Sequence, residues 1–259
     1  MEKYVNNHSF VSIIMAAYNA EKTIAKSIES VLGQTYKDFE LIVINDCSKD
    51  RTQSIVEAYQ SRDSRLRLIN NKVNSGVSIT RHTGLQNARG EYIAILDSDD
   101  SWERDKLQRQ IELVKSKNAR LVYTGVSYID ENEVKKRWIM HVPTRITYRS
   151  LLYQNMITNS SALVEKRLFE AYESLGDKMH EDYACWLKIL RSGVTAIGID
   201  EPLLEYRVSS KSKSGNKIKS GLMIWRTYRY VGLNVIQSLY YLTCYMINGS
   251  LKHYRIKNS

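Results

Sequence analysis

The feature that most constrains this chain is an apolar run of strand length that ends abruptly on carboxylates. Residues 92–96 are uninterrupted and apolar, which is typical of a strand buried on both faces of a sheet. Asp97, Asp99 and Asp100 follow immediately. Because open α/β sheets bind their ligands beyond the carboxyl ends of the strands, we expect these acids at a binding edge.

The three acids repel one another unless a cation or protons offset their charge. Hard divalent cations such as Mg²⁺ and Mn²⁺ take oxygen ligands, commonly one or two carboxylates plus substrate phosphates. The acids could instead only begin a helix, because Asp100 and Glu103 match a capping box before residues 107–114. A cap needs one acid, however, so the pattern favours a metal site.

Apolar runs and amphipathic stretches alternate along the first half of the chain. Strand-length runs occupy 11–15, 39–44 and 66–69, and helical spacing occupies 24–32, 51–60 and 77–88. Arg89 and Gly90 are expected to end the last of these helices as a C-cap. The alternation predicts βαβ units and a mostly parallel sheet, so the expected fold class is α/β.

The alternation loosens after residue 117. We expect a strand at 120–124, an antiparallel excursion at 126–142, a short helix at 148–154, a strand at 157–164 and a helix at 181–191. The basic, serine-rich stretch 209–220 is expected to be a mobile loop or a lid, with a plain linker as the alternative.

The tail 222–259 combines an apolar stripe with basic flanks. No charged residue occurs between Arg229 and Lys252, and apolar residues recur there every three or four positions. Polar residues interrupt the stripe, which therefore lacks the roughly 20 predominantly apolar residues of a spanning helix. The pattern predicts an amphipathic helix that lies on a membrane of anionic lipid, or docks on the rest of the chain or on a second subunit.

The charge and the cysteines limit the class of protein. A net charge of +10 and a pI near 9.3 favour an anionic partner, such as nucleic acid, anionic lipid or a phosphorylated substrate. No nucleic acid is expected, because the positive charge concentrates near the C-terminal helix instead of forming a stripe with interleaved aromatics. Cys47, Cys185 and Cys244 lack metal spacing and the N-terminus lacks an apolar signal core, so a cytoplasmic protein is expected.

Two other strand ends also carry polar groups. Tyr18 follows the first predicted strand and Asp46 follows the second. At adjacent strand tips, an aromatic ring can stack on a nucleobase while a carboxylate accepts one of its hydrogen bonds. Asp46 could equally be a turn residue, but polar groups at three junctions of one edge favour a nucleotide site.

These segments resemble a known family. The stretches VSIIMAAYNAEKTIAKSIESVLGQTYKDFELIVINDCSKDRT and NSGVSITRHTGLQNARGEYIAILDSDDSW are similar to the N-terminal part of family 2 glycosyltransferases of the GT-A fold, and HEDYACWLKIL resembles an acidic element of that family. The resemblance implies a Rossmann-like, mostly parallel sheet flanked by helices. We expect a catalytic domain at 1–208 and a helical tail at 209–259. Within the domain, the nucleotide-binding part would cover 9–125 and the acceptor part 126–208.

The resemblance also implies roles for matching residues around a UDP-sugar. The positions at or beside the uridine pocket are Ala17, Tyr18, Asp46, Asn19 and Glu21, and those beside the diphosphate are Asn74, Gly76 and Arg81. Arg81 could equally be a charge on the surface of a helix. The chain departs from the common pattern at Asn45, where many members have Asp, and at Ala16, where a small hydroxyl or Pro is frequent.

The acidic run matches the DXD motif of the same family. Asp97, followed by Ser98, would face the ribose, and Asp99 would ligate Mn²⁺ or Mg²⁺ together with the diphosphate. Asp100 could share that duty, because some relatives keep only the later pair of acids. The metal and Arg81 would then offset the charge that develops on the leaving diphosphate.

The implied reaction is inverting transfer of a hexosyl or N-acetylhexosaminyl group from a UDP-sugar to a hydroxyl of a saccharide acceptor. The base must lie opposite the leaving group, so it comes from a separate segment. Glu181 and Asp182 open a helix, and only one of them faces the sugar, because neighbours on a helix point about 100° apart. We expect Asp182 rather than Glu181 to be the base.

Two other classes compete with this interpretation. A sugar-nucleotide pyrophosphorylase would need a Gly-rich basic loop after the first strand, where this chain has Ala16, Ala17 and Tyr18. A non-catalytic nucleotide-sugar-binding protein is disfavoured because all the acids are present. The tail is expected to bring the enzyme to a lipid-linked acceptor at the inner face of the cytoplasmic membrane, or to form a homodimer.

Overall fold

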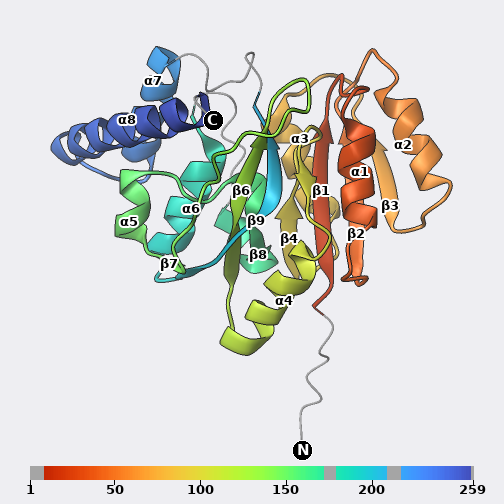
Figure 1. The fold of residues 1–259 in the computed structure, drawn as a ribbon, viewed down its shortest axis with the longest axis horizontal. Coiled ribbons are helices and arrows are strands. Elements are labelled where there is room, and N and C mark those ends of the chain that lie inside the picture. Colours follow the sequence, from red (N-terminus) through yellow and green to blue (C-terminus); the bar gives the residue numbers. More distant parts are fainter. Residues whose placement is uncertain (1–8, 172–178, 209–216, 258–259) are drawn as a thin grey trace, which may run out of the picture.

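The computed structural model describes residues 9–171, 179–208 and 217–257, and within these ranges a nine-stranded sheet forms the centre of the molecule (Figure 1). In spatial order the strands are β3 (Leu66–Asn70), β2 (Phe39–Asn45), β1 (Val11–Ala17), β4 (Tyr92–Ile95), β8 (Leu163–Glu165), β6 (Leu121–Ile129), β9 (Ala196–Arg207) and β5 (Ser101–Trp102), and β7 (Arg145–Ile146) pairs with β9. Helices flank this sheet, which confirms the expected α/β class.

The first half of the sheet is parallel, as its sequence predicts. β3, β2, β1 and β4 pair in parallel, with Val11 beside Phe39 on one side and Tyr92 on the other. Every residue of β2 is buried, which explains its apolar character. The connecting helices are α1 (Ile24–Leu32), α2 (Thr52–Gln60) and α3 (Val77–Asn87), and α3 packs on β1 and β2. The carboxyl ends of all four strands therefore meet at one edge.

The second half of the sheet is mixed and depends on β9. β8 runs antiparallel to β4 and β6, whereas β6 and β9 are parallel. The twelve-residue β9 was not expected, because Asp200, Glu201 and Pro202 interrupt its apolar pattern. β5 and β7 have two residues each and form by pairing with β9, so they leave no periodic signal of their own.

The strand expected at 157–164 is mostly a turn. A 3₁₀ helix, η1 (Asn159–Ser161), occupies its middle, and β8 begins only at Leu163. Ser161 Oγ donates to Thr158 O at 2.7 Å, and local bonds of this kind compete with strand pairing. The other described helices of this half are α4 (Lys106–Lys117), α5 (Tyr148–Tyr153), η2 (Lys166–Ala171) and α6 (Glu181–Arg191).

The capping box of Asp100 and Glu103, which was the alternative to a metal site, does not form. α4 begins at Lys106, with Asp105 at its N-cap position and no capping bond from that side chain. Between the acids and this helix, Ser101–Trp102 forms β5. Asp100 lies too far upstream to cap α4, and its carboxylate bonds elsewhere.

Gly90 is needed for close backbone contact and not as the expected helix cap. α3 ends at Asn87, three residues earlier, and the residue at its C-cap position, Ala88, is extended. A Cβ on Gly90 would lie 2.4 Å from Ser12 N and 2.8 Å from Phe10 O, both in or beside β1. Only glycine lets the chain enter β4 this close to its neighbour.

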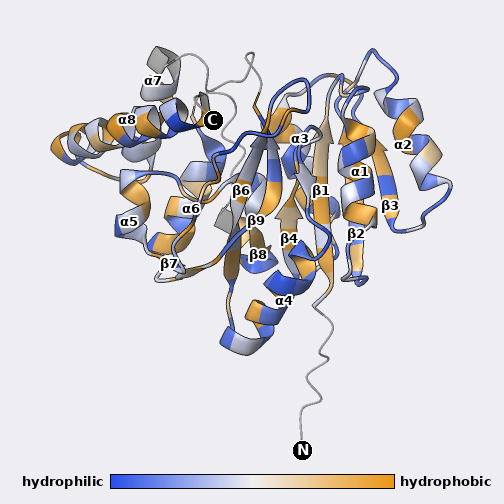
Figure 2. Ribbon diagram, in the orientation of Figure 1, coloured by the Kyte–Doolittle hydropathy of each residue, from blue (hydrophilic) through white to orange (hydrophobic). Residues whose placement is uncertain are grey.

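The tail forms two helices instead of one. α7 (Lys217–Tyr230) and α8 (Val235–Lys257) are separated by a turn in which Gly232 has a φ of 84°. Ile224 and Tyr228 of α7 are fully buried, so this helix docks on the rest of the chain. α8 packs on α5 and α7 and carries apolar residues along its length (Figure 2).

No described helix is long and apolar enough to cross a membrane. The loop or lid expected at 209–220 lies mainly outside the described residues.

Substitution of two glycines tests whether Gly90 is required for close backbone contact with β1. Gly90→Ala should lower the free energy of unfolding by about 1–3 kcal/mol, because the backbone of β1 must move to admit the methyl group. Gly249→Ala should raise it by about 1 kcal/mol, because Gly249 lies within α8 and an added Cβ meets nothing there. Urea unfolding of both variants measures the difference, and a Gly90→Ala protein as stable as the wild type would contradict this account.

Candidate active site

Hydrogen bonds join the loop after β1 to the loop after β2 at the carboxyl edge of the sheet. Asn19 Oδ1 accepts a hydrogen bond from Lys49 N at 2.8 Å, and Glu21 Oε2 accepts one from Arg51 N at 3.2 Å. Asn19 has a φ of 49°, in the left-handed region that Asn tolerates better than most residues. The two residues expected beside the uridine pocket thus shape the loop after β1 by bonding to the loop after β2.

Tyr18 and Asp46 lie side by side at the tips of β1 and β2, as expected. Asp46 N donates to Ala17 O at 2.8 Å, which holds the two strand ends together. Tyr18 is 50% exposed, so a face of its ring is open to a stacking partner. Ala17 is buried and contributes shape to this edge instead of a polar contact.

The Asp46 carboxylate anchors the loop between β3 and α3. Its Oδ1 accepts from Asn71 Nδ2 at 2.8 Å and from Ser75 N at 2.9 Å, and its Oδ2 accepts from Gly76 N at 2.9 Å. Asn74 Nδ2 donates to the Asp46 backbone oxygen at 3.3 Å. Since a carboxylate has about four acceptor positions, Asp46 retains room for one further hydrogen bond. It therefore sets the path of the loop that was expected beside the diphosphate.

The hydrogen bonds of Asn45 explain why this chain has an amide where the common pattern has Asp. Its Nδ2 donates to Asn70 Oδ1 at 2.8 Å, and its Oδ1 accepts from Ser48 N at 3.1 Å. A carboxylate could accept from Ser48 but could not donate to Asn70. The amide therefore links the ends of β2 and β3 while it shapes the loop after β2.

Arg81 lies between carboxylates from two distant segments. It is buried, so the alternative of a charge on the helix surface is wrong. One nitrogen forms a short ion pair with Asp97 at the end of β4, and Nη1 lies 3.3 Å from Glu181 Oε1 at the start of α6. Its charge is thus already offset by two acids. Arg81 fixes the acidic turn and the helix α6 relative to each other.

Asp99 is the acid of this turn most suited to meet a ligand. It is partly exposed, as are Asp97 and Ser98. Burial and the neighbouring Asp97 charge raise the pKa of Asp99 to about 6. A raised pKa means that the ionised carboxylate lacks sufficient compensating charge, so a cation at this position would be favourable.

Asp100 has a different environment, because protein donors occupy both of its oxygens. Ser160 Oγ donates to Oδ2 at 2.7 Å and Arg207 N donates to Oδ1 at 3.0 Å. Arg207 Nε also donates to Asp99 O at 3.2 Å. Burial and the charges of Asp97 and Asp99 raise the pKa of Asp100 well above its usual value. Sequence reasoning missed Ser160 and Arg207, which carry no motif and reach the turn only through the tertiary placement of η1 and β9.

The two acids that open α6 differ in exposure. Glu181 is buried and paired with Arg81, whereas Asp182 is only partly buried. Both occupy the first turn of α6, where the helix dipole favours negative charge. Of the pair, Asp182 is the carboxylate more accessible to a bound molecule.

A divalent cation fits the donors of the acidic turn. Among the described residues, no group of three or more His, Cys, Asp or Glu side chains is arranged so that it could hold a metal ion by itself. Mg²⁺ commonly takes one or two protein carboxylates and completes its shell with substrate phosphates and water. Asp99 meets this requirement, whereas ligation by Asp100 would compete with its bonds to Ser160 and Arg207.

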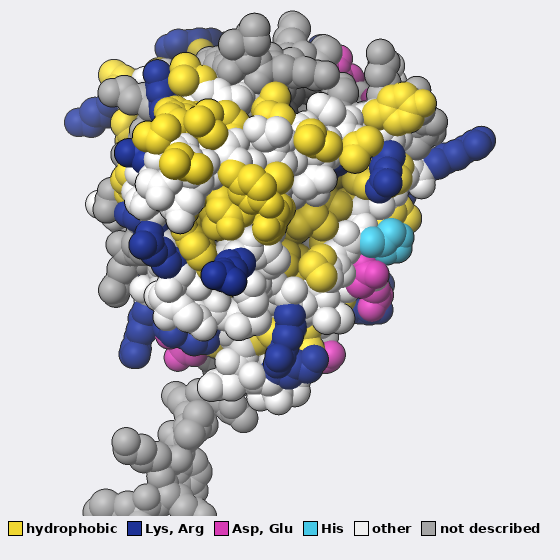
Figure 3. All heavy atoms as spheres, turned by 90° about the vertical axis from the view of Figure 1, so that its left-hand side faces the viewer, with side chains coloured by type: hydrophobic (Ala, Val, Ile, Leu, Met, Phe, Trp, Pro, Cys, Tyr) yellow, Lys and Arg dark blue, Asp and Glu magenta, His cyan; other side chains and the backbone are white. Residues whose placement is uncertain are grey.

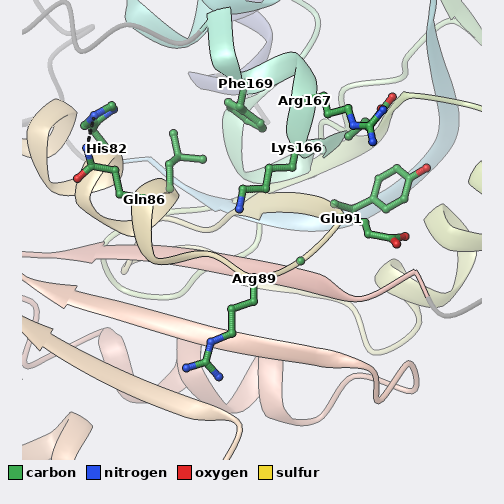
Figure 4. Close-up of a pocket in the computed structure, with 11 residues that line it drawn as sticks. His82, Gln86, Arg89, Glu91, Lys166, Arg167 and Phe169 are labelled. Carbon is green, nitrogen blue, oxygen red and sulfur yellow. Dashed lines mark hydrogen bonds between the residues drawn. The ribbon is translucent and has the colours of Figure 1, made fainter.

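A cavity of about 680 Å³ lies at the other end of β4 (Figure 4). It is lined by the C-terminal half of α3, residues 89–92 and η2, with Lys166 Nζ donating to Ala88 O at 2.6 Å. None of the expected site residues lines it. The candidate active site is therefore the carboxyl edge of the sheet and not this cavity.

A family model and individual known sequences identify the same family. Residues 12–172 match the model of "Glycosyl transferase family 2". The chain is 33% identical over 221 residues to a putative teichuronic acid biosynthesis glycosyltransferase, TuaG, of Bacillus subtilis, which covers 85% of this chain and 88% of TuaG. It is 36% identical over 244 residues to the Escherichia coli UDP-Glc:alpha-D-GlcNAc-diphosphoundecaprenol beta-1,3-glucosyltransferase WfgD, covering 94% of both chains.

Comparison with solved structures supports the GT-A type of fold. Staphylococcus aureus TarS 1-349 in complex with UDP-GlcNAc aligns with a TM-score of 0.70 at 20% identity, covering 90% of this chain and 70% of TarS. The mannosyltransferase PcManGT from Pyrobaculum calidifontis, in complex with GDP-Man and Mn²⁺, aligns with a TM-score of 0.67 at 17% identity, covering 90% and 68%. At these identities the likeness concerns the fold.

Measurements of the free energy of unfolding can distinguish the role of Asp99 from that of Asp100. Asp100→Ala should lower the free energy of unfolding by about 1–3 kcal/mol, because it leaves the Ser160 hydroxyl and the Arg207 amide without their acceptor. Asp99→Asn should cost no stability at pH 8, because it removes a charge repelled by Asp97. Urea unfolding gives both values. If the two substitutions destabilise equally, the anchoring role of Asp100 is wrong.

Proposed function

The chain belongs to glycosyl transferase family 2, as its sequence resemblance predicted, and on that premise we propose that it transfers a sugar from a UDP-sugar to a hydroxyl of a lipid-linked saccharide. The observation that carries this proposal is the Arg81 ion-pair network, which joins the acidic turn to the helix that supplies the base. The acids that we assign to the donor side and to the acceptor side would thus meet at one edge of the sheet. Family membership sets aside the pyrophosphorylase alternative.

The donor side of the proposed site lies along β1, β2 and the loop after β3. Tyr18 would stack on the uracil ring, and the remaining acceptor position of Asp46 would receive a hydrogen bond from the base. Asp97 would bond the ribose while it holds Arg81. The relatives support a UDP-sugar, since WfgD is named for UDP-Glc and TarS was solved with UDP-GlcNAc.

Asp99 would hold Mn²⁺ or Mg²⁺ together with the diphosphate. When bound, the cation would neutralise the charge of the leaving UDP. Arg81 would act mainly by positioning Asp97 and Glu181, because its own charge is compensated by those acids. This changes the role expected for Arg81 from contact with the diphosphate to support of the groups around it.

The acceptor side would use Asp182 as the general base. The acceptor oxygen attacks the anomeric carbon, its proton passes to Asp182, and the bond from that carbon to the diphosphate oxygen breaks. Attack from the face opposite UDP inverts the anomeric centre. Glu181 would keep Asp182 in place through its pair with Arg81. The transferred group would be a hexosyl or N-acetylhexosaminyl group.

A lipid-linked acceptor would place the reaction at the inner face of the cytoplasmic membrane. WfgD supports such an acceptor, because its name specifies a diphosphoundecaprenol-linked GlcNAc. The protein would then act as a peripheral enzyme in the synthesis of a cell-surface polysaccharide.

A panel of UDP-sugars tests the proposed reaction. UDP release should depend on one or a few sugars and on a GlcNAc-diphospho-lipid acceptor, and EDTA should lower it by at least about a hundredfold, with recovery on added Mn²⁺. Asp99→Ala should behave like the EDTA-treated enzyme. Full activity in EDTA would contradict the metal, and activity only with other nucleotide-sugars would contradict the donor.

Asp182→Asn tests the assignment of the base. It should lower kcat by about 10²–10⁴-fold while UDP binding stays unchanged, because the base acts on the acceptor and not on the nucleotide. Glu181→Gln is the matched control. It should lose stability through the weakened Arg81 pair but keep more activity than Asp182→Asn. If Glu181→Gln loses turnover and Asp182→Asn does not, Glu181 is the base.

A further inference from the structure

α8 presents two faces of opposite environment. On its inner face, Tyr245 lies 5.5 Å from Tyr183 between ring centroids, and Lys252 Nζ lies 5.9 Å from the centre of the Tyr128 ring. Its outer face is exposed and largely apolar, and consists of Ile236, Leu239, Tyr240, Ile247, Leu251 and Tyr254. Each of these six side chains is more than half exposed, and Ile236 reaches 80%. Thr243 and Ser250 are exposed polar residues of the same helix, but the face is mostly apolar, and an exposed apolar face of this kind marks an interaction surface.

Positive charge surrounds this outer face. Figure 3 shows apolar side chains gathered on the side of the molecule formed by the C-terminal helices, with Lys and Arg around them and few acids. Arg226, Arg229 and Arg255 are exposed on α7 and α8. An apolar stripe bordered by cations is typical of a helix that lies in the interface of an anionic membrane.

The distribution of charge along the chain is equally uneven. The last 54 residues, from Tyr206 onward, contain ten Lys and Arg and no Asp or Glu. The preceding 205 residues contain 28 basic and 28 acidic residues, so the entire net charge of +10 resides in this final segment. The first 205 residues thus carry no net charge, and nine of the ten cations follow β9, in the part of the chain that includes α7 and α8.

We propose that the outer face of α8 docks on the surface of a membrane that contains anionic lipid, with the helix axis parallel to that surface. The apolar stripe would enter the boundary between headgroups and acyl chains, and the flanking cations would bind the lipid phosphates. This inference names the surface that would serve the proposed function, and it rests on that function only for its biological purpose.

A second copy of the chain is the less suitable occupant. A symmetric dimer through this face would bring two acid-free segments, each with ten Lys and Arg, against each other. Like charges at an interface oppose association, whereas an anionic lipid surface offers the complementary charge. The charge therefore favours lipid over self-association through α8.

Docking in this orientation would bring the membrane close to the base. Tyr183, which contacts Tyr245 of α8, directly follows Asp182 in α6. His180, at the start of the same helix, lies with its Nε2 3.4 Å from Ser220 Oγ of α7. The docked helices would thus lie directly beside the segment that accepts the acceptor's proton, where a saccharide attached to lipid could reach it.

Vesicle co-sedimentation of the full-length chain tests the docking surface without donor or acceptor. Wild-type protein should sediment with vesicles of phosphatidylglycerol and phosphatidylcholine but not with phosphatidylcholine alone. Raising the ionic strength from about 0.05 M to about 0.5 M should weaken binding. The double variant Ile236→Ser/Ile247→Ser should bind at least about tenfold more weakly.

The matched control is Val134→Ser, which removes a 56% exposed apolar side chain outside the C-terminal helices and should bind like the wild type. Urea unfolding should show that all variants are folded. Wild-type binding that ignores lipid charge, or a double variant that binds like the wild type, would overturn the proposal. So would light scattering that shows a dimer disrupted by the double substitution, with no vesicle binding. Because no sugar is transferred, these outcomes are independent of the glycosyltransfer assays.

Discussion

The ion pairs of Arg81 are the constraint on which the candidate site depends. This buried side chain joins Asp97, just after β4, to Glu181, which lies 100 residues after Arg81 in the chain. A buried charge is tolerated only when it is paired, and removal of one partner is strongly destabilising. The acidic turn and the start of α6 are therefore held at a fixed separation. The proposed one-step displacement would require such a separation, because donor and base would act on opposite faces of one sugar.

The acids around this edge divide into anchors and groups available to a ligand. Asp46 holds the loop before α3 through two backbone amides and Asn71, and Asp100 holds η1 and β9 through Ser160 and Arg207. These carboxylates preorganise the site, since each bond they accept removes a freedom of a loop. Asp99 and Asp182 are less buried than these anchors, which is why we propose them as the partners of a cation and of the acceptor proton.

The sequence left open whether the C-terminal tail docks on the rest of the chain, on a membrane or on a second subunit. In the structure, the first of these does not exclude the others. α7 is buried against the catalytic part of the chain, and the inner face of α8 packs there too. The outer face of α8 stays exposed and apolar, in the segment that carries the whole net positive charge. One helix can therefore dock on the protein and on lipid at the same time, and it lies beside the helix of the proposed base.

The sequence by itself determined the parallel half of the sheet, its helices, the α6 boundaries and the family. Those features are local, because a buried parallel strand is apolar throughout and an amphipathic helix repeats every three or four residues. Only the tertiary structure decided the strands β5, β7 and β9, the break between α7 and α8, and the separate environments of Asp99 and Asp100. The physical reason is that these features depend on partners distant in sequence. Whether a carboxylate meets a ligand or an anchor depends on whether Ser160 and Arg207 reach it, and no local pattern records that contact.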